Sequence, residues 1–422
     1  MLTKQLIAVA CGLFLLTTPL LGQGKRIWVL RASGEMVEYD PGSFAVKQTV
    51  TVPADVAQAP QNVSVNHVGQ ILFAPAVTLP LAESDVESPH KAWFWTGHAA
   101  TTIDLGVKRE AGAAGSNQAV TESAPEVYLT ADGAHLFWFA NSARRLQREE
   151  MDLSTATTWQ AWQTDLSGVG REDLATMKLP DCRCPSGSCE ESCPYGVIWA
   201  PEDGLGKFFL VSQFVAGKEE PVYKASTRYQ EESGKWTAYP IDEPLRRVLD
   251  AASGGDVVVE AIPDSGCCGW VNQSNDQTLV HRAGKTVTVF DERATYKNPD
   301  YDVSFSTSNA KLSPELGLVA LTIVATATAD KAIQLAQDGQ ANPEESKLIR
   351  KALAELPAVA VESMDDPPKR VAFLPHAVLV GWISEKELLI VEDHVLVEYN
   401  VATGARKKST VRAEDAGRVF LR

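Results

Sequence analysis

Short apolar segments alternate with polar, glycine-containing turns along most of the chain. Near the beginning, the apolar segment 27–30 is followed by a turn at Gly34, an alternating segment at 36–40, a second turn and a further segment. The same order returns near the end of the chain, and the two copies align without a gap when Tyr39 is matched with Tyr399. Each copy predicts a strand, a tight turn, an alternating strand, a polar turn and another strand.

A second recurring unit is a polar, glycine-containing turn that leads directly into a continuous apolar run. Such runs are typical of strands buried on both faces, whereas strands with one solvated face alternate. We therefore expect each run to be the buried second strand of a four-stranded sheet. The runs occupy residues 71–73, 135–139, 208–211 and 318–324. A looser copy of the first unit occupies residues 284–291.

The two units recur at roughly 40 to 65 residues, the repeat length of four-stranded propeller blades with insertions. The pattern resembles the broad β-propeller superfamily of exported bacterial proteins, in architecture only, because no Trp-Asp signature, no recurring Gly-His signature and no other family-specific motif accompanies it. The resemblance implies an all-β propeller of six or seven blades, with seven preferred. The matched end copies predict one blade built from both chain ends, which closes the ring. Two β-sandwich domains are the alternative.

One segment departs from the strand pattern and predicts a small helical hairpin inserted at about residues 328–357. Its first half has apolar residues at helical spacing and stops at Gly339. Its second half begins with Asn342 and Pro343, a helix cap and a first-turn proline, and ends at Pro357. We expect the hairpin to cover one propeller face, with a lid or docking element as the alternative.

The first residues have the order of an export signal. Lys4 precedes an almost uninterrupted apolar run, and Gly22 supplies a small residue before polar sequence begins. A membrane anchor is the alternative, but the run is short and a proline interrupts it. We therefore expect a signal peptide at 1–22 and an exported protein, periplasmic or secreted, with a single propeller domain at 23–422.

Charge argues against two classes of partner. The chain carries 54 acidic and 39 basic residues, a net charge of −15 at pH 7, and neither sign is gathered in a long block. Nucleic acids and anionic membrane surfaces are bound by basic patches, so we expect neither as a partner. The sequence indicates no cofactor and no membrane insertion after signal removal. We expect a monomer that binds a protein, a glycan or a small ligand.

Six cysteines follow the predicted signal peptide, four in a polar loop at 181–194 and two adjacent to each other. An even number of cysteines in an exported protein is typical of disulfides, each of which stabilises a fold by roughly 2–4 kcal/mol. Metal or redox chemistry is the alternative, although the paired spacing usual for zinc is absent. The predicted disulfide cysteines are Cys182, Cys184, Cys189, Cys193, Cys267 and Cys268, and their pairing stays open.

The loop after the adjacent cysteines is the candidate ligand-binding site. It combines an aromatic residue with amide and carboxylate side chains, and binding residues gather on loops held by a rigid scaffold. The alternative is a crossover whose Asn and Asp side chains cap their own backbone. The candidate binding residues are Trp270, Asn272, Asn275, Asp276 and Gln277.

The sequence contains no catalytic motif that we recognise. It has no Gly-x-Ser-x-Gly elbow, no His-Glu-x-x-His pair and no phosphate-binding glycine loop, and its seven histidines are dispersed. We therefore expect a non-catalytic propeller that binds its ligand through loops on one face, with no metal site. The first alternative is a propeller hydrolase, lyase or oxidoreductase with a site assembled in the central channel. The second is a cysteine-based metal or redox protein.

Overall fold

A computed structural model of the chain defines its sheets. The structure describes residues 25–58, 61–75, 91–104, 119–122, 126–129, 135–145, 158–165, 171–178, 198–199, 208–216, 221–232, 235–241, 245, 247–252, 257–262, 276–282, 284–296, 305–313, 315, 317–325, 343–413 and 418–422. The predicted signal peptide, the six predicted disulfide cysteines and the first half of the predicted helical hairpin lie outside these residues.

The described residues form seven antiparallel sheets. The first sheet contains strands from both ends of the chain, and we call it the closing sheet. In spatial order it consists of β29 (Val419–Leu421), β1 (Ile27–Leu30), β2 (Glu35–Tyr39) and β3 (Val46–Thr51). The second sheet consists of β4 (Gln61–Val65), β5 (Ile71–Pro75), β6 (Lys91–Trp95) and β7 (Ala100–Asp104). The third consists of β12 (Arg171–Lys178), β11 (Thr158–Asp165) and β10 (His135–Arg145), with both β8 (Ala119–Glu122) and β9 (Glu126–Leu129) paired to β10.

The remaining sheets follow the chain order. The fourth consists of β13 (Ile198–Trp199), β14 (Phe208–Ala216), β15 (Pro221–Glu232) and β16 (Lys235–Ile241). The fifth consists of β17 (Arg247–Ala251), β18 (Val257–Ile262), β19 (Gln277–Arg282) and β20 (Lys285–Asp291). The sixth consists of β21 (Phe305–Ser313), β22 (Leu318–Ala325), β23 (Ala358–Ser363) and β24 (Arg370–Pro375). The last sheet consists of β25 (Ala377–Trp382), β26 (Glu387–Glu392), β27 (Val395–Asn400) and β28 (Arg406–Arg412).

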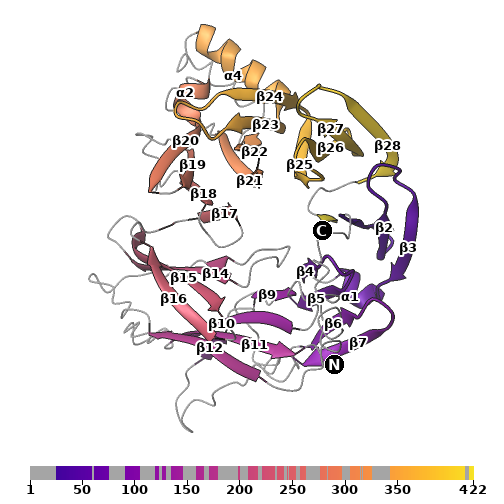
Figure 1. The fold of residues 1–422 in the computed structure, drawn as a ribbon, viewed down its shortest axis with the longest axis vertical. Coiled ribbons are helices and arrows are strands. Elements are labelled where there is room, and N and C mark those ends of the chain that lie inside the picture. Colours follow the sequence, from indigo (N-terminus) through magenta and orange to yellow (C-terminus); the bar gives the residue numbers. More distant parts are fainter. Residues whose placement is uncertain are drawn as a thin grey trace, which may run out of the picture.

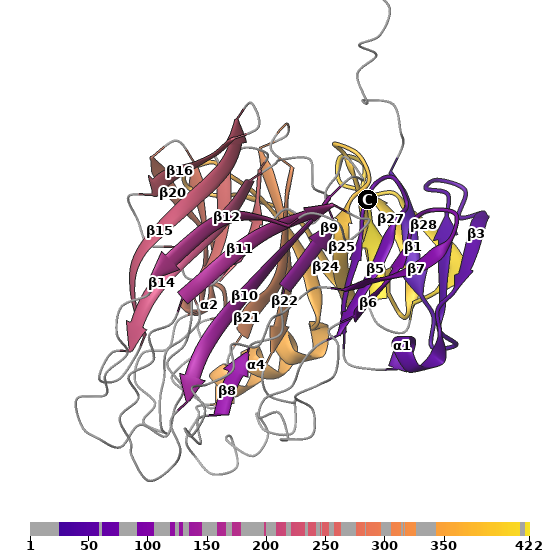
Figure 2. The same cartoon turned by 90° about the horizontal axis from the view of Figure 1, so that it is seen from below.

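The sheets follow one another around a ring in the order of the sequence (Figure 1), and the view from below shows them standing side by side (Figure 2). The closing sheet therefore lies beside the last sheet, although the two come mainly from opposite ends of the chain. A shared core joins them: Ile27, Val29 and Tyr39 of the closing sheet belong to one buried cluster with Leu389 and Val391 of the last sheet. The prediction of an all-β fold built from four-stranded antiparallel sheets is confirmed.

The continuous apolar runs are the second strands of their sheets, as predicted. They form β5, β10, β14 and β22, each of which has a partner strand on both sides. Their described side chains include some of the most deeply buried in the protein, such as Ile71, Leu136 and Leu321, each with no exposed surface. These strands need no polar face, because a sheet on either side covers them.

The two matched end copies occupy equivalent strands of neighbouring sheets. One copy forms β1 to β3 and the other forms β26 to β28. A sheet is shared by both chain ends, as predicted, but the strand that the C-terminal end contributes is the short β29, not the matched copy. Its pairing places Ile27 opposite Leu421 and Val29 opposite Val419. The looser copy at 284–291 is not equivalent, because it forms β20, the fourth strand of its sheet.

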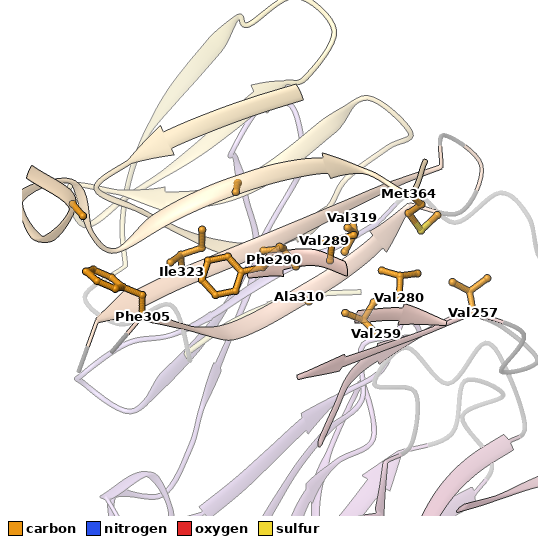
Figure 3. Close-up of a cluster of buried hydrophobic side chains, with 13 residues drawn as sticks. Val257, Val259, Val280, Val289, Phe290, Phe305, Ala310, Val319, Ile323 and Met364 are labelled. Carbon is orange, nitrogen blue, oxygen red and sulfur yellow. The ribbon is translucent and has the colours of Figure 1, made fainter. Parts of the chain in front are cut away.

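Buried apolar clusters fill the space between successive sheets. Among the described residues the largest joins the fifth and sixth sheets, and Figure 3 shows Val259 and Val280 of the former facing Ala310 and Val319 of the latter. Burial of each such Val or Leu side chain contributes about 1.5–3 kcal/mol. The sheets are therefore held to one another mainly by apolar packing.

The first strands of the fifth, sixth and last sheets, β17, β21 and β25, are the inner strands of these sheets, and each carries a β-bulge at the same place. The bulges lie between Val248 and Asp250, between Thr307 and Asn309, and between Leu379 and Gly381. The residue after each bulge meets the inner strand of the next sheet: Asp250 meets Leu312, Asn309 meets Leu379, and Gly381 meets Leu421. Asp250 Oδ2 accepts the Leu312 N–H at 2.7 Å, and Asn309 Nδ2 donates to the Leu379 carbonyl at 3.1 Å. Bulges re-aim side chains along a strand, and two of these three provide polar contacts between sheets.

The second half of the predicted hairpin is confirmed as helix α4 (Pro343–Glu355), which starts at the predicted first-turn proline. In the chain, α4 lies between β22 and β23, two strands of the sixth sheet. Ala352 and Leu353 pack on the buried cluster between the fifth and sixth sheets. The other described helices are short, α1 (Ala54–Gln58) and α2 (Glu292–Tyr296). Within the described part of the chain, none of the helices is long and apolar enough to cross a bilayer.

Truncation of a β29 side chain tests the shared sheet. Val419 is 7% exposed, and Val419→Ala removes two buried methyl groups, so we expect the free energy of unfolding to fall by about 2 kcal/mol. The matched control is Val371→Ala at a position that is 47% exposed, where the expected loss is below about 0.5 kcal/mol. Urea denaturation followed by tryptophan emission measures both. Equal effects of the two substitutions would show that β29 does not bury Val419.

Candidate functional site

A pocket of about 890 Å³ opens between the closing sheet and the last sheet. Its walls come from β1, the turn after it, β2 and β3 on one side, and from the end of β28 and the approach to β29 on the other. We call it the seam pocket. Its lining residues are Val29, Leu30, Arg31, Ala32, Ser33, Tyr39, Phe44, Val46, Thr410, Val411, Arg412, Ala413 and Arg418.

Strand alternation explains which residues of the closing sheet reach this pocket. Neighbouring side chains of a strand point to opposite faces, so Val29 and Tyr39 share one face, and Trp28 and Met36 share the other. The first pair belongs to the core with the last sheet, and the second pair belongs to the core with the second sheet. Both faces of the closing sheet are therefore covered by neighbours.

Three arginines line the seam pocket. Arg31 Nη2 donates to the Tyr39 hydroxyl at 2.6 Å, and its Nη1 lies 3.7 Å from a Glu35 carboxylate oxygen. Arg412 and Arg418 are exposed, and no ion pair or hydrogen bond of their side chains is found in the described structure. Among the described residues, the pocket therefore holds one arginine oriented by a tyrosine and two arginines whose guanidinium groups have no partner.

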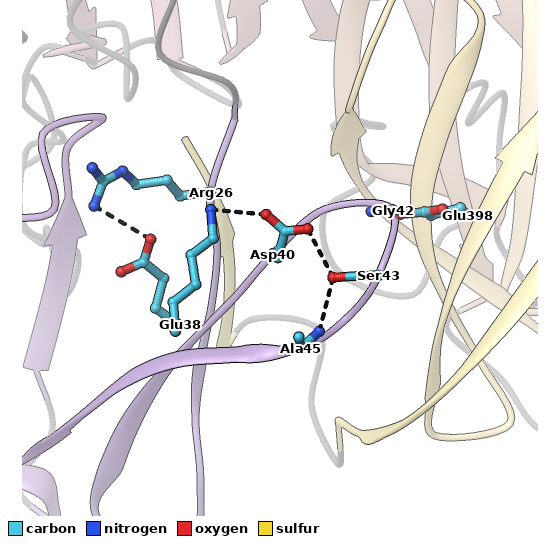
Figure 4. A network of polar contacts seen from close by, with 8 residues as sticks. Arg26, Glu38, Asp40, Gly42, Ser43, Ala45 and Glu398 are labelled. Carbon is cyan, nitrogen blue, oxygen red and sulfur yellow. Dashed lines mark hydrogen bonds and ion pairs between the residues drawn. The ribbon is translucent and has the colours of Figure 1, made fainter.

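The turn at residues 40–45 forms the outer wall and is fixed to the last sheet. Glu398 of β27 accepts the Gly42 N–H (both residues are labelled in Figure 4), and Lys407 Nζ lies 5.9 Å from the centre of the Phe44 ring. Phe44 has φ 55°, a left-handed conformation that costs a non-glycine residue free energy and persists where the surroundings hold it. These contacts keep the Phe44 ring at the pocket.

Asp40 stabilises the same turn from within. Its carboxylate lies 2.8 Å from Lys47 Nζ and accepts the Ser43 hydroxyl at 2.7 Å (Figure 4). The hydrogen bond from Lys47, and then the one from Ser43, lower the pKa of Asp40 below its usual value of 3.8.

Only two of the five predicted binding residues lie within the described part of the chain, and both make internal contacts. Asp276 is buried; its carbonyl accepts the Glu292 N–H at 3.0 Å, and its own N–H donates to the Glu292 carboxylate at 3.4 Å. Gln277 Nε2 donates to Asp291 at 2.7 Å. These two residues join the start of β19 to the end of β20. Trp270, Asn272 and Asn275 lie outside the described residues.

The fifth sheet contains a carboxylate, an imidazole and a hydroxyl in a row. Glu260 Oε2 lies 2.7 Å from His281 Nε2, and His281 Nδ1 lies 3.1 Å from Thr286 Oγ1. The three residues come from the adjacent strands β18, β19 and β20, and none of them lines the seam pocket. The row joins three strands through side chains. In the described part of the chain no group of three or more His, Cys, Asp or Glu residues could hold a metal ion.

The sequence alone does not predict that the three arginines share a pocket, because Arg31 lies far from the other two in the chain. Arg31 follows β1, whereas Arg412 and Arg418 flank the approach to β29. Only the pairing of β29 with β1 makes them neighbours. In the sequence, each arginine is only a polar residue near a turn, and most turns contain such residues.

No protein-family model matches the chain, and no curated protein resembles it in sequence. Solved structures resemble it at low identity, and several of them are known β-propellers. A putative 6-phosphogluconolactonase from Bacteroides uniformis is 10% identical, with a TM-score of 0.47 and with 95% of this chain and 100% of that chain covered. A functionally unknown protein from Desulfotomaculum acetoxidans is 8% identical, with a TM-score of 0.41 and with 94% and 98% covered.

The acylaminoacyl peptidase of Pyrococcus horikoshii is 12% identical, with a TM-score of 0.43 and with 90% of this chain covered. The match spans 48% of the peptidase, so this chain corresponds to about half of that protein's length. Similarity at this level assigns neither a ligand nor an activity.

The lowered pKa of Asp40 predicts a pH-dependent contribution of the turn to stability. Because the folded state binds this proton more weakly than the unfolded chain does, the carboxylate stabilises the fold above the unfolded pKa near 3.8 and ceases to do so as the pH falls through the lower folded pKa. We expect wild-type protein to have a higher Tm than Asp40→Asn above about pH 5, with the difference shrinking toward about pH 2. Thermal melts across this range measure it.

Asp365→Asn, at an exposed position that forms no ion pair in the described structure, is the control and should give no such trend. A Tm difference for Asp40→Asn that is the same at all pH values would contradict the assignment.

Proposed function

We propose that the protein is an exported, monomeric, seven-bladed β-propeller that binds a small organic anion in the seam pocket without transforming it. The observation that carries this proposal is the set of three arginines over an apolar floor. The export signal, the monomeric state and the blade number are parts of the proposal, and they rest on the sequence pattern and on the ring of sheets.

The chemistry of the pocket favours an anion with an apolar part. Arginine binds carboxylates and related groups through two parallel N–H donors, and a charge-assisted hydrogen bond of this kind contributes about 1.5–3 kcal/mol. The floor is apolar, with Val29, Val411 and Ala413 buried. A pocket of about 890 Å³ is in the range that takes a drug-sized molecule.

The charge of the whole chain makes this local positive charge more selective. With a net charge of −15, the protein as a whole repels anions. The arginines of the seam pocket attract an anion locally. The apolar floor adds affinity for an organic anion over an inorganic one.

The lining also favours binding over catalysis. Its described residues offer guanidinium groups, hydroxyls and apolar side chains, and none of them carries an imidazole, a thiol or a carboxylate. General acid–base catalysis near neutral pH mostly uses one of these three groups within hydrogen-bond reach of the substrate. The seam pocket can therefore hold an anion, but its described lining lacks an evident proton acceptor.

Binding of 1-naphthaleneacetate by the full-length protein tests the proposal, with 1-naphthaleneacetamide as the neutral analogue. We expect calorimetry to show binding of the acid only, and we expect Arg412→Ala and Arg418→Ala each to weaken it about tenfold, since one charge-assisted hydrogen bond is lost. Neither substitution should change Tm, because both side chains are exposed and form no ion pair within the described residues.

Arg247→Ala removes an exposed arginine of the fifth sheet and should leave binding unchanged. Equal binding of the acid and the amide, or no effect of the two pocket substitutions, would contradict the proposal.

A further inference from the structure

The opposite face of the closing sheet carries a second pocket, of about 450 Å³, at its contact with the second sheet. We call it the turn pocket, because two turns of the second sheet, at 66–70 and 96–99, form one wall. The closing sheet forms the other. The lining residues are Arg26, Gln48, Val68, Gly69, Gln70, Thr96, Gly97 and His98.

The arginine of the lining is neutralised by a buried carboxylate. Arg26 Nη1 lies 3.3 Å from Glu38 Oε1, and the Glu38 side chain is only 5% exposed (Figure 4). A buried carboxylate beside an arginine forms a tight pair, because each charge would be costly to leave alone. Unlike the seam pocket, the turn pocket therefore has no uncompensated guanidinium group among its described lining residues.

Gly69 allows the arginine to lie against the turn. Its φ of +87° is a conformation that side chains disfavour, and a Cβ there would lie 2.8 Å from Arg26 Nη1 and 3.7 Å from Trp28 Cζ2. The indole of Trp28 thus lies directly behind the wall of the pocket, with Cζ2 two bonds from its N–H.

Two hydrogen-bonding side chains at the pocket have no partner among the described residues. The Gln48 amide and the His98 ring have no partner in the described structure, in which Gln70 and Thr96 are already engaged by neighbours in their own turns. An amide and an imidazole both donate and accept, which suits hydroxyl groups.

Three buried nitrogen atoms of the closing and second sheets and their turns also lack hydrogen-bond partners within the described part of the chain. They are Trp28 Nε1, His67 Nδ1 and Trp95 Nε1. Trp28 is completely buried, His67 lies in one turn, and Trp95 immediately precedes the other. Trp28 and Trp95 belong to one buried cluster between the closing sheet and the second sheet. A buried donor without a partner costs about 1–3 kcal/mol, so the two indole N–H groups indicate that water or a ligand completes them.

We propose that the turn pocket is a second ligand site, for a neutral monosaccharide. Gln48 and His98 bind its hydroxyl groups at the mouth, while the buried indole N–H groups of Trp28 and Trp95 are satisfied through hydroxyl groups or ordered water. This site is independent of the anion in the seam pocket, because the two pockets lie on opposite faces of one sheet.

Fluorine NMR of the full-length protein labelled with 5-fluorotryptophan tests the site. Glucose, galactose and N-acetylglucosamine are the probes, with glucuronate as the charged counterpart and with Trp28→Phe and Trp95→Phe variants to assign the signals. We expect at least one neutral sugar to shift the Trp28 or Trp95 signal with millimolar affinity, and glucuronate to bind at least fivefold more weakly.

Substitutions at the mouth separate a binding role from a structural one. Gln48→Ala and His98→Ala should each weaken sugar binding at least fivefold without changing Tm, whereas Arg418→Ala in the seam pocket should leave it unchanged. The proposal is overturned if none of the three sugars shifts either signal, if glucuronate binds equally well, or if both mouth variants bind sugar like wild type. Loss of anion binding in the seam pocket would not affect this result.

Discussion

The pairing of β29 with β1 is the constraint on which the rest of the structure depends. Only three residues form β29, yet they complete the closing sheet and supply Val419 and Leu421 to the core shared with the last sheet. Arg26 and Arg422 exchange backbone hydrogen bonds at the end of this pairing, and Arg422 Nε donates to the Val65 carbonyl of the second sheet at 2.6 Å. The C-terminal strand therefore contacts the sheets on both sides of it.

Both pockets follow from the position of the closing sheet between two neighbours. Along β1 and β2, alternate side chains pack on the last sheet and on the second sheet, so each face contributes to a different core. The seam pocket and the turn pocket lie next to turns at these two contacts, and their lining side chains determine which ligands they favour. Among the described lining residues, Arg412 and Arg418 of the seam pocket have no carboxylate partner, whereas Arg26 of the turn pocket is paired with Glu38.

Regular features of the sequence predicted regular features of the fold. Strands buried on both faces, such as β5 and β22, were readable as continuous apolar runs, and Pro343 marked the start of α4. The third strand copy at 284–291 was misplaced, because one strand–turn unit looks alike at two positions of a sheet. A shared sheet was expected from the matched end copies, but β29 is too short to carry a pattern of its own.

The seam pocket could not be predicted from the sequence, for a physical reason. Arg31 and Arg418 are separated by nearly the whole chain, and only tertiary packing brings them to one pocket. Asp276 and Gln277, two residues of the predicted binding loop, join the start of β19 to the end of β20. The other three residues of that loop and the six cysteines lie outside the described residues, so the disulfide and loop-binding hypotheses stay predictions.

Hydrogen–deuterium exchange of the full-length chain and of a chain lacking residues 419–422 tests the closure most directly. We expect slow exchange of peptides from β1 and β25 in the full-length protein, and faster exchange of both when β29 is absent, because β29 pairs with β1 and Leu421 packs against Gly381. Unchanged protection of both strands after the truncation would contradict a ring closed by the C-terminal strand.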